Sequence, residues 1–364
     1  MDTRSECENH GGVPEEGHND VTTTEPRIVT LGTAGGPRWW ADHAGEPRFG
    51  IATAVVVGDR WYLVDCGDGA GHQAKAAGLP MPALSGIFLT HMHSDHLVDL
   101  PGIVLFGAFE LKSRSAGSIP IVGPGDRGRL TPLSPQASWR PDPVAPERPT
   151  PGVAGLLDGL LAAFATDIND RIFDSLAKSP RDTFEAREID LDGVRGFDPD
   201  TAVSPDMEPI EVFGDDLVTV TATLVSHHPM APAFAYRFDT EHGSVTISGD
   251  TAPCDNLVRL ARDTDLLLHE AIDLDMLAAQ YSDTAMLKAT MDHHRRSHTT
   301  PADAGRIAAR AGARHLALHH LVPSHAHPEV WHGAQQTFDG PLTIPEDLDT
   351  LSFARLPQPA GAAT

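Results

Sequence analysis

The chain has 364 residues, of which 40% are hydrophobic and 21% charged, a balance typical of a globular protein with a substantial core. Its formal net charge of -24 disfavours a large polyanionic partner, because nucleic-acid binders use basic surfaces to neutralise phosphates. No apolar run suits a membrane span or a signal peptide, and three scattered cysteines form no disulfide framework, so we expect a cytoplasmic protein without a membrane partner.

The N-terminal part of the chain predicts a tail followed by strands. Residues 1–26 are polar, acidic and poor in core-forming side chains, which predicts a disordered tail ahead of a domain at 27–364. The domain opens with the β-branched segment RIVTLG and the glycines of TAGGP. Two apolar runs follow, separated by Gly58 and Asp59 in the manner of a β-hairpin. The second run ends at Asp65, which we expect to order the next loop by hydrogen bonds rather than to bind metal.

The next predicted strand, LSGIFLT, leads into the segment HMHSDH at residues 91–96. On an extended backbone His91 and His93 point the same way, whereas Asp95 and His96 follow where the chain turns. Imidazole and carboxylate suit zinc, iron or manganese, and the absence of thiolates in this segment is unlike a structural zinc finger. Two differently directed pairs of ligands predict two metal ions, which need a shared carboxylate between them.

Later apolar strands also end at residues that bind metals. The ends are, in chain order, His227 and His228, Asp250, His269 and Glu270, and His319 and His320. Strand ends at one side of a sheet bring distant positions together, so we expect these side chains to meet, with Asp250 as the shared carboxylate. Helices are predicted at 255–264 and at 300–313, the second with Thr300 as N-cap and Pro301 at its first position.

The stretch 125–209 interrupts this pattern. It begins proline-rich and continues with apolar residues at helical spacing, namely Leu156, Leu157, Leu160, Leu161, Phe164, Ile168 and Ile172. This spacing predicts one or two helices, which we expect to form a cap over the metal cleft. A structural insertion without a role in substrate access is the alternative. The stretch contains nine Lys or Arg residues and sixteen Asp or Glu residues, so it predicts a poor clamp for RNA.

HMHSDH, with LVDCGDG upstream and SGDT and LALHHL downstream, resembles the H-x-H-x-D-H motif of the metallo-β-lactamase superfamily. Within it, the segments LGTAGGP, DLLLHEA, RSHTTPADAG and LALHHLVP resemble the ribonuclease Z and arylsulfatase-like branch. The resemblance implies an α/β fold, the metallo-β-lactamase αββα sandwich, with the helical, proline-rich stretch 125–209 as an inserted cap. It also implies a homodimer. In this branch a protruding arm rich in glycine and proline holds tRNA.

The resemblance implies two metal sites, the first formed by His91, His93 and His227 and the second by Asp95, His96 and His320. Asp250 then lies between the two metals. His228 is the alternative to His227, which falls where the family has its strand-end histidine. His319 is the alternative to His320, which directly precedes LVP as in the family pattern.

The same resemblance implies a dinuclear metal-dependent hydrolase that holds two divalent metal ions, with zinc expected and manganese or iron as alternatives. A metal-bridging hydroxide oriented by Asp95 would attack an ester-type bond. Glu270 and His298 would form a proton relay, although SHTT stands where the family more often has HST. The acidic balance favours a small ester, lactone, sulfate ester or phosphodiester as substrate. A ribonuclease Z-like endonuclease that processes tRNA 3′ ends and a di-iron redox protein are the alternatives, and a basic patch at His293–Arg296 near the cleft would favour the endonuclease.

Overall fold

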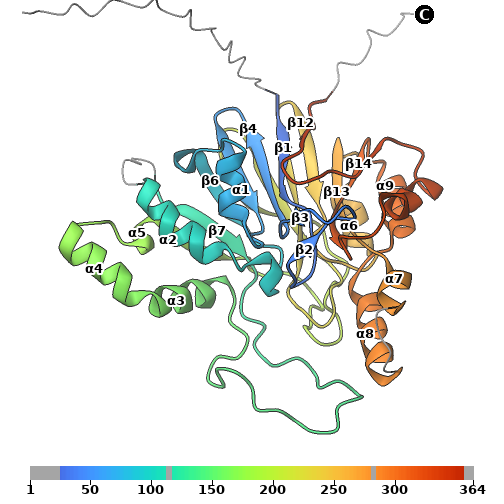
Figure 1. The fold of residues 1–364 in the computed structure, drawn as a ribbon, viewed down its shortest axis with the longest axis horizontal. Coiled ribbons are helices and arrows are strands. Elements are labelled where there is room, and N and C mark those ends of the chain that lie inside the picture. Colours follow the sequence, from blue (N-terminus) through green and yellow to red (C-terminus); the bar gives the residue numbers. More distant parts are fainter. Residues whose placement is uncertain (1–24, 112–116, 280–283, 356–364) are drawn as a thin grey trace, which may run out of the picture.

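The computed structural model describes residues 25–111, 117–279 and 284–355, so the predicted tail at 1–26 lies almost wholly outside the described residues. Two seven-stranded sheets pack face to face, and helices cover the outer face of each sheet (Figure 1). The αββα sandwich expected from the sequence motifs is therefore confirmed.

The sheets contain neighbouring strands that are far apart in sequence. The first sheet consists, in spatial order, of β16 (Thr350–Ser352), β1 (Arg27–Gly32), β4 (Ala52–Val57), β5 (Arg60–Val64), β6 (Leu84–Phe88), β7 (Ile119–Gly123) and β8 (Phe184–Glu188). The second consists of β15 (Leu342–Thr343), β14 (Leu316–Val322), β13 (Leu266–Ile272), β12 (Gly243–Ile247), β11 (Phe234–Thr240), β10 (Thr219–Leu224) and β9 (Ile210–Gly214). A separate short ribbon pairs β2 (Trp40–Ala41) with β3 (Pro47–Arg48).

The helices lie mainly outside the two sheets. The α-helices are α1 (Ala70–Ala76), α2 (Leu100–Glu110), α3 (Val153–Ala163), α4 (Ala165–Ser175), α5 (Pro180–Thr183), α6 (Asp255–Leu260), α7 (Leu274–Ala279), α8 (Thr284–Ser297), α9 (Pro301–Ala311) and α10 (Pro328–Trp331). Short 3-10 helices are η1 (Met81–Ala83), η2 (Ser94–His96) and η4 (His332–Gln336). Within the described ranges, none of the helices has the length and apolar character needed to cross a membrane.

Alternation along the strands produces the four layers. In β1, Ile28 points into the core between the two sheets, whereas Val29 points to the outer core beneath α1 and α2. In β4, Val55 likewise points into the core between the sheets, and Val56 points to the outer core. Since successive side chains of a strand point to opposite faces, such β-branched runs bury both faces of each sheet. The hairpin at Gly58 and the N-cap of α9 by Thr300 form as predicted.

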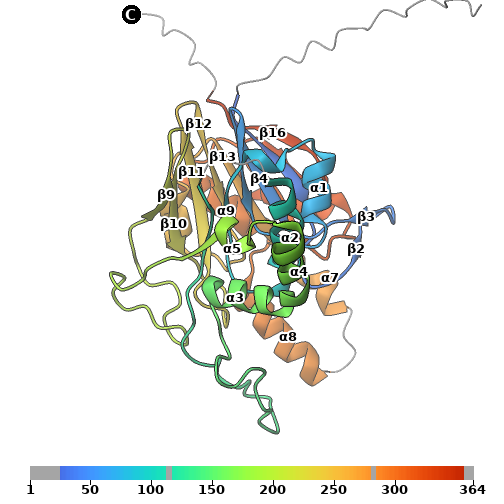
Figure 2. The ribbon, with the colours of Figure 1, turned by 90° about the vertical axis from the view of Figure 1, so that its left-hand side faces the viewer.

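Strand direction gathers the site at one edge of the sandwich. β6 runs parallel to β7, and β12 runs parallel to β13 and β14, so their carboxyl ends share an edge within each sheet. β10 is antiparallel to β11, which is antiparallel to β12, so β10 ends at the same edge as β12. The loop at 124–152, which follows β7, extends away from the body of the molecule in both views (Figures 1 and 2).

The inserted stretch forms the two expected helices, α3 and α4, but their position differs from the expectation. Val153, Leu157 and Ile168 belong to the core on the outer face of the first sheet, together with residues of α2. Burial of that apolar stripe holds both helices at the flank of the molecule, at the left in Figure 1. The cleft described below is lined by other residues of the same stretch, namely Arg127, residues 131–136, Pro199 and Asp200, and by no residue of α3 or α4.

Candidate metal centre

The segment 91–96 leaves β6 in an extended conformation and then turns. His93 has φ -73° and ψ 146°, and η2 begins directly after it. His91 Nε2 lies 2.9 Å from His93 Nδ1, as expected for two side chains that point the same way. Asp95 and His96 lie within the turn, so their side chains take a different direction from the first pair.

His227 completes a first group of possible ligands with His91 and His93. The candidate ligand atoms of these residues and Asp250 all lie within 4.8 Å of one another. His227 Nε2 is 3.1 Å from His93 Nδ1, and its Nδ1 lies 2.8 Å from the Ser297 carbonyl oxygen. A carbonyl oxygen accepts only from a protonated nitrogen, so Nε2 presents its lone pair to the group. Among the residues that the structure describes, His228 belongs to no such group, and it instead lines the neighbouring cleft.

Asp95, His96 and His320 form a second group within the same 4.8 Å limit. His96 Nε2 lies 3.2 Å from His320 Nε2, and Asp95 Oδ2 lies 3.5 Å from that atom. His96 Nδ1 lies 2.8 Å from Asp65 Oδ2, which fixes the direction of the ring. Asp65 also accepts hydrogen bonds from the Thr90 backbone N–H and hydroxyl, at 2.8 Å each. The expected ordering of the loop by Asp65 is confirmed.

Asp250 lies between the two groups and presents one carboxylate oxygen to each. Its Oδ2 is 3.9 Å from His91 Nε2 and 3.8 Å from His227 Nε2. Its Oδ1 is 3.4 Å from His96 Nε2 and 3.2 Å from His320 Nε2, yet this buried atom has no hydrogen-bond partner among the described residues. A buried carboxylate oxygen facing imidazole lone pairs costs free energy unless a cation compensates it. The donor set therefore fits a pair of divalent metal ions.

An irregularity in the second sheet distinguishes His320 from His319. The pairing of β13 with β14 shifts after Glu270 and His319, so that Ala271 is opposite Leu321 and His320 is the extra residue. His320 has φ +48°, an uncommon conformation for a residue other than glycine. This bulge turns the His320 side chain toward Asp250, whereas His319 belongs to neither group of ligands.

The glycines that follow β1 are close to the second group. A Cβ atom on Gly35 would lie 2.4 Å from the His320 ring, so only glycine allows the ring to lie there. The Gly36 backbone N–H donates a 2.9 Å hydrogen bond to Asp95 Oδ2. We did not predict either role from the sequence, although two adjacent glycines directly after a strand often mark a close approach of the backbone to a site.

Burial and neighbouring charge set the protonation of the site. Burial lowers the pKa of both His91 and His227, which leaves their imidazoles neutral and able to bind metal. Burial opposes ionisation of Asp95, but the neighbouring His96 and His320 outweigh it and lower the pKa of Asp95. The carboxylate therefore stays charged beside the imidazoles, as a metal ligand requires.

Glu270 and His298 form a buried pair beside Asp250. His298 Nδ1 lies 3.0 Å from Glu270 Oε1, and the Glu270 side chain is completely buried. Burial raises the pKa of Glu270. Burial opposes protonation of His298, but the charges of Glu270 and Asp250 outweigh it and raise the pKa of His298 to about 9. The two carboxylates therefore favour the protonated form of His298.

A cleft of about 1160 Å³ borders the candidate centre. Its walls come from the segment 36–40, the loop residues 127–136 and the end of α8. The charged residues of the lining are Arg38, Arg127, Arg295, Arg296, Asp200 and Asp292, and His228, His293 and His294 line it as well. Arg127 pairs with Asp200, whereas Arg38, Arg295 and Arg296 form no ion pair within the described residues. The cleft is therefore locally basic, unlike the chain as a whole.

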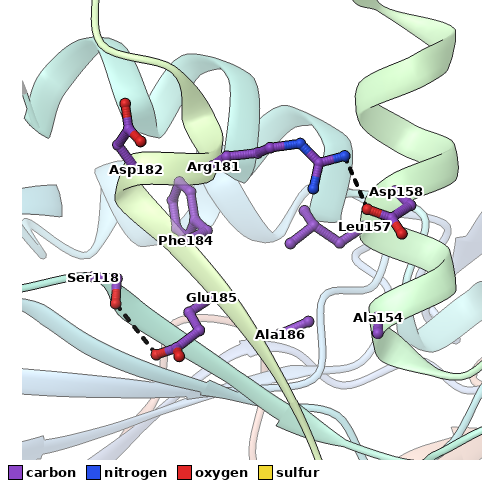
Figure 3. Close-up of a pocket in the computed structure, with 9 residues that line it drawn as sticks. All are labelled: Ser118, Ala154, Leu157, Asp158, Arg181, Asp182, Phe184, Glu185 and Ala186. Carbon is purple, nitrogen blue, oxygen red and sulfur yellow. Dashed lines mark hydrogen bonds and ion pairs between the residues drawn. The ribbon is translucent and has the colours of Figure 1, made fainter.

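A second cavity, of about 530 Å³, lies between α3, α5 and β8 and shares no lining residue with the cleft (Figure 3). Its Arg181 pairs with Asp158 at 2.9 Å, and Ser118 donates a 3.3 Å hydrogen bond to Glu185. Asp182 and Glu185 give it a mainly acidic lining. Since its one arginine is already paired, this cavity lacks the free positive charge of the cleft.

Comparison with known proteins agrees with this architecture. The profile of the metallo-β-lactamase superfamily matches residues 45–112. Ribonuclease Z of Mycolicibacterium gilvum (strain PYR-GCK) is 29% identical over 306 residues, 83% of this chain and 89% of that protein. Ribonuclease Z of Mycobacterium bovis (strain BCG / Pasteur 1173P2) is 29% identical over 332 residues, 88% and 96% of the two chains.

A solved structure of human tRNase Z, short form, has a similar fold. The TM-score is 0.56 at 20% sequence identity, and the similarity covers 90% of this chain and all of that one. The profile match includes the segment 91–96, and the structural match extends the likeness to both sheets. The chain therefore has the metallo-β-lactamase fold, and its residues 45–112 match the profile of that superfamily.

Proposed function

We propose that this protein is a two-metal phosphodiesterase that cleaves RNA, and that its substrate is the 3′ end of a tRNA precursor. The observation that carries the proposal is the basic cleft beside the two groups of ligands. Arg38, Arg295 and Arg296, which form no ion pair with any of the described residues, offer guanidinium groups there that suit the phosphates of a nucleic-acid strand. The similarity to proteins named ribonuclease Z agrees with this substrate class.

The seven ligands predicted from the sequence are those we assign to the metals. His91, His93 and His227 would hold one ion, Asp95, His96 and His320 would hold the other, and Asp250 lies where it could serve both. When bound, two divalent ions supply a hydroxide nucleophile near neutral pH and neutralise charge on the phosphoryl oxygens. Zinc suits the imidazole and carboxylate ligands, and manganese and iron are the alternatives.

His298 and Glu270 supply the proton that cleavage requires. The hydrogen bond between His298 Nδ1 and Glu270 Oε1 fixes the ring and leaves Nε2 free to face a substrate. When the bond between phosphorus and the leaving oxygen of the RNA breaks, that oxygen takes the proton from Nε2. The carboxylate of Glu270 stabilises the protonated ring before this transfer.

The loop at 124–152 is much less acidic than the rest of the insertion and extends away from the body of the molecule. It contains four arginines and three acidic residues, whereas 153–209 contains five basic and thirteen acidic residues. Trp139 on this loop is 69% exposed, so its ring is free to stack on a base. The base of the loop is fixed by Arg127 and Arg129, which pair with Asp200. We propose that this loop, rather than α3 and α4, contacts RNA outside the cleft.

The test compares a tRNA precursor with bis(p-nitrophenyl) phosphate and with a carboxylic ester, a lactone and a sulfate ester, using zinc-loaded protein. We expect both phosphodiesters to be hydrolysed, and Asp250→Ala to abolish both reactions. Hydrolysis of the other esters alone would favour the small-substrate alternative, and redox activity of an iron-loaded form would favour the di-iron alternative.

Two arginine variants test the cleft itself. The double variant Arg295→Ala/Arg296→Ala should weaken binding of the tRNA precursor and lower the slope of log affinity against log salt by about 0.7–0.9 for each phosphate that the protein no longer neutralises. Hydrolysis of bis(p-nitrophenyl) phosphate should change little, since this small diester has no strand to hold. The matched control Arg306→Ala/Arg310→Ala removes two exposed charges from α9, on the outer face of the second sheet. An equal effect of both double variants would contradict a role for the cleft.

A further inference from the structure

Three histidines at the end of α8 form another cluster beside the candidate centre. His293 and His294 lie near the end of α8, and His298 follows the helix directly. Their ring centroids are 5.3 Å, 5.6 Å and 6.2 Å apart, and their candidate ligand atoms all lie within 4.8 Å of one another. His293 and His294 belong to neither group of ligands around Asp250.

The hydrogen bonds of these rings leave nitrogen atoms available. His298 uses Nδ1 for Glu270, which leaves Nε2 without an assigned partner in the absence of substrate. An imidazole held from behind by a carboxylate is the usual arrangement of a metal-binding histidine. His294 Nδ1 is buried and has no hydrogen-bond partner within the described part of the chain. A buried polar atom without a partner is unfavourable, so it needs an explanation.

We propose that His293, His294 and His298 bind a third metal ion, a transition metal such as zinc or nickel. Three imidazoles would leave one position of a four-coordinate ion open, and the cleft that His293 and His294 line would give a further ligand access to it. The site has no carboxylate in its ligand set and lies near the end of a helix. We therefore expect it to bind more weakly than the two sites that share Asp250.

The third ion has a consequence for turnover, which rests on the proposed function. His298 Nε2 is the atom assigned both to proton donation and to this ion. The two roles exclude each other, because a metal ion occupies the lone pair on which the transferable proton is carried. Metal in excess of two equivalents should therefore inhibit hydrolysis, so that activity first rises and then falls with metal concentration.

A titration that needs no substrate tests the site. Metal-free protein is titrated with zinc and with nickel against a chelator of known affinity. The wild-type chain should bind three equivalents, the third more weakly, and His293→Gln and His294→Gln should each bind two. The matched control His332→Gln, which replaces an exposed histidine, should still bind three. Circular dichroism checks that each variant is folded.

The outcomes separate the site from the function. A total of two equivalents in the wild-type chain, or a third equivalent that persists in both cluster variants, would overturn the site. Failure of the chain to cleave RNA would overturn the proposed function while leaving the titration result intact. Inhibition at high metal concentration that disappears in both His293→Gln and His294→Gln would support the shared use of His298 Nε2.

Discussion

Replacing Gly35 by alanine tests the candidate centre without removing any proposed ligand. A Cβ at this position would lie 2.4 Å from the Cε1 and Nδ1 atoms of His320, whereas ordinary contacts are 3.4–4 Å. The ring must therefore move by about 1 Å, several times the tolerance of about 0.2 Å for a metal–ligand distance. We expect Gly35→Ala to weaken binding of one of the two shared-site ions by at least about 10- to 100-fold, the loss typical of disturbed ligand support.

The assay is competition with a chromophoric chelator, combined with metal analysis of the purified protein. Gly159→Ala is the matched control, since Gly159 lies in α3 with open space around it and alanine there should stabilise the helix by about 0.5–1 kcal/mol. Wild-type affinity for two ions in Gly35→Ala would refute the assignment of His320 as a ligand. An equal loss of metal in His319→Gln and His320→Gln would also contradict the role given to the β14 bulge.

Three further predictions concern the supporting residues. Asp65→Asn replaces the carboxylate that accepts a hydrogen bond from His96 Nδ1 by an amide. Metal affinity should fall about 10- to 100-fold in the same chelator assay. Unchanged affinity would contradict a role of Asp65 in supporting His96. Glu270→Gln removes a charge that raises the pKa of His298. The proton donor is lost as pH rises through the pKa of His298, so kcat of the wild-type chain should fall near pH 9. In the variant, kcat should fall at a lower pH. A fall of kcat at the same pH in both proteins would exclude the relay. Thr300→Ala removes the cap of α9 and should lower the free energy of unfolding by about 1 kcal/mol in urea titrations. A loss smaller than the one caused by replacing a surface threonine that caps no helix would count against the cap.

Local signals in the sequence predicted much of the site. The segment 91–96 carries four predicted ligands on one short stretch, so their mutual positions depend on nearby backbone only. The N-cap Thr300 and the hairpin at Gly58 are local in the same sense. The expected strands ending near His227 and Asp250 formed as well, because alternating or continuous apolar runs identify buried strands.

Features that depend on distant contacts could not be predicted in this way. The choice between His319 and His320 depends on a bulge in the pairing of β14 with β13, which the local sequence does not indicate. The apolar stripe of α3 and α4 shows that these helices are buried on one side, but the surface they cover is set by α2 and the first sheet. Arg127 reaches the cleft through a loop whose path follows no periodic pattern.

For a related reason, the net charge of the whole chain does not describe the charge of the cleft. The acidic residues of the insertion gather in 153–209, whereas the arginines of the cleft come from 38, 127 and the end of α8. A sum over the chain cannot show such a separation, although a phosphate responds mainly to charges within a Debye length of about 10 Å. The patch at His293–Arg296 that would favour an endonuclease lines the cleft.

The most direct test of the two-metal centre is anomalous diffraction at the zinc absorption edge from crystals of the zinc-loaded protein. The account predicts two strong peaks about 3.5–4 Å apart, one on each side of the Asp250 carboxylate. The first should contact His91, His93 and His227, and the second should contact Asp95, His96 and His320. A single peak, or peaks that do not contact Asp250, would contradict the proposed centre.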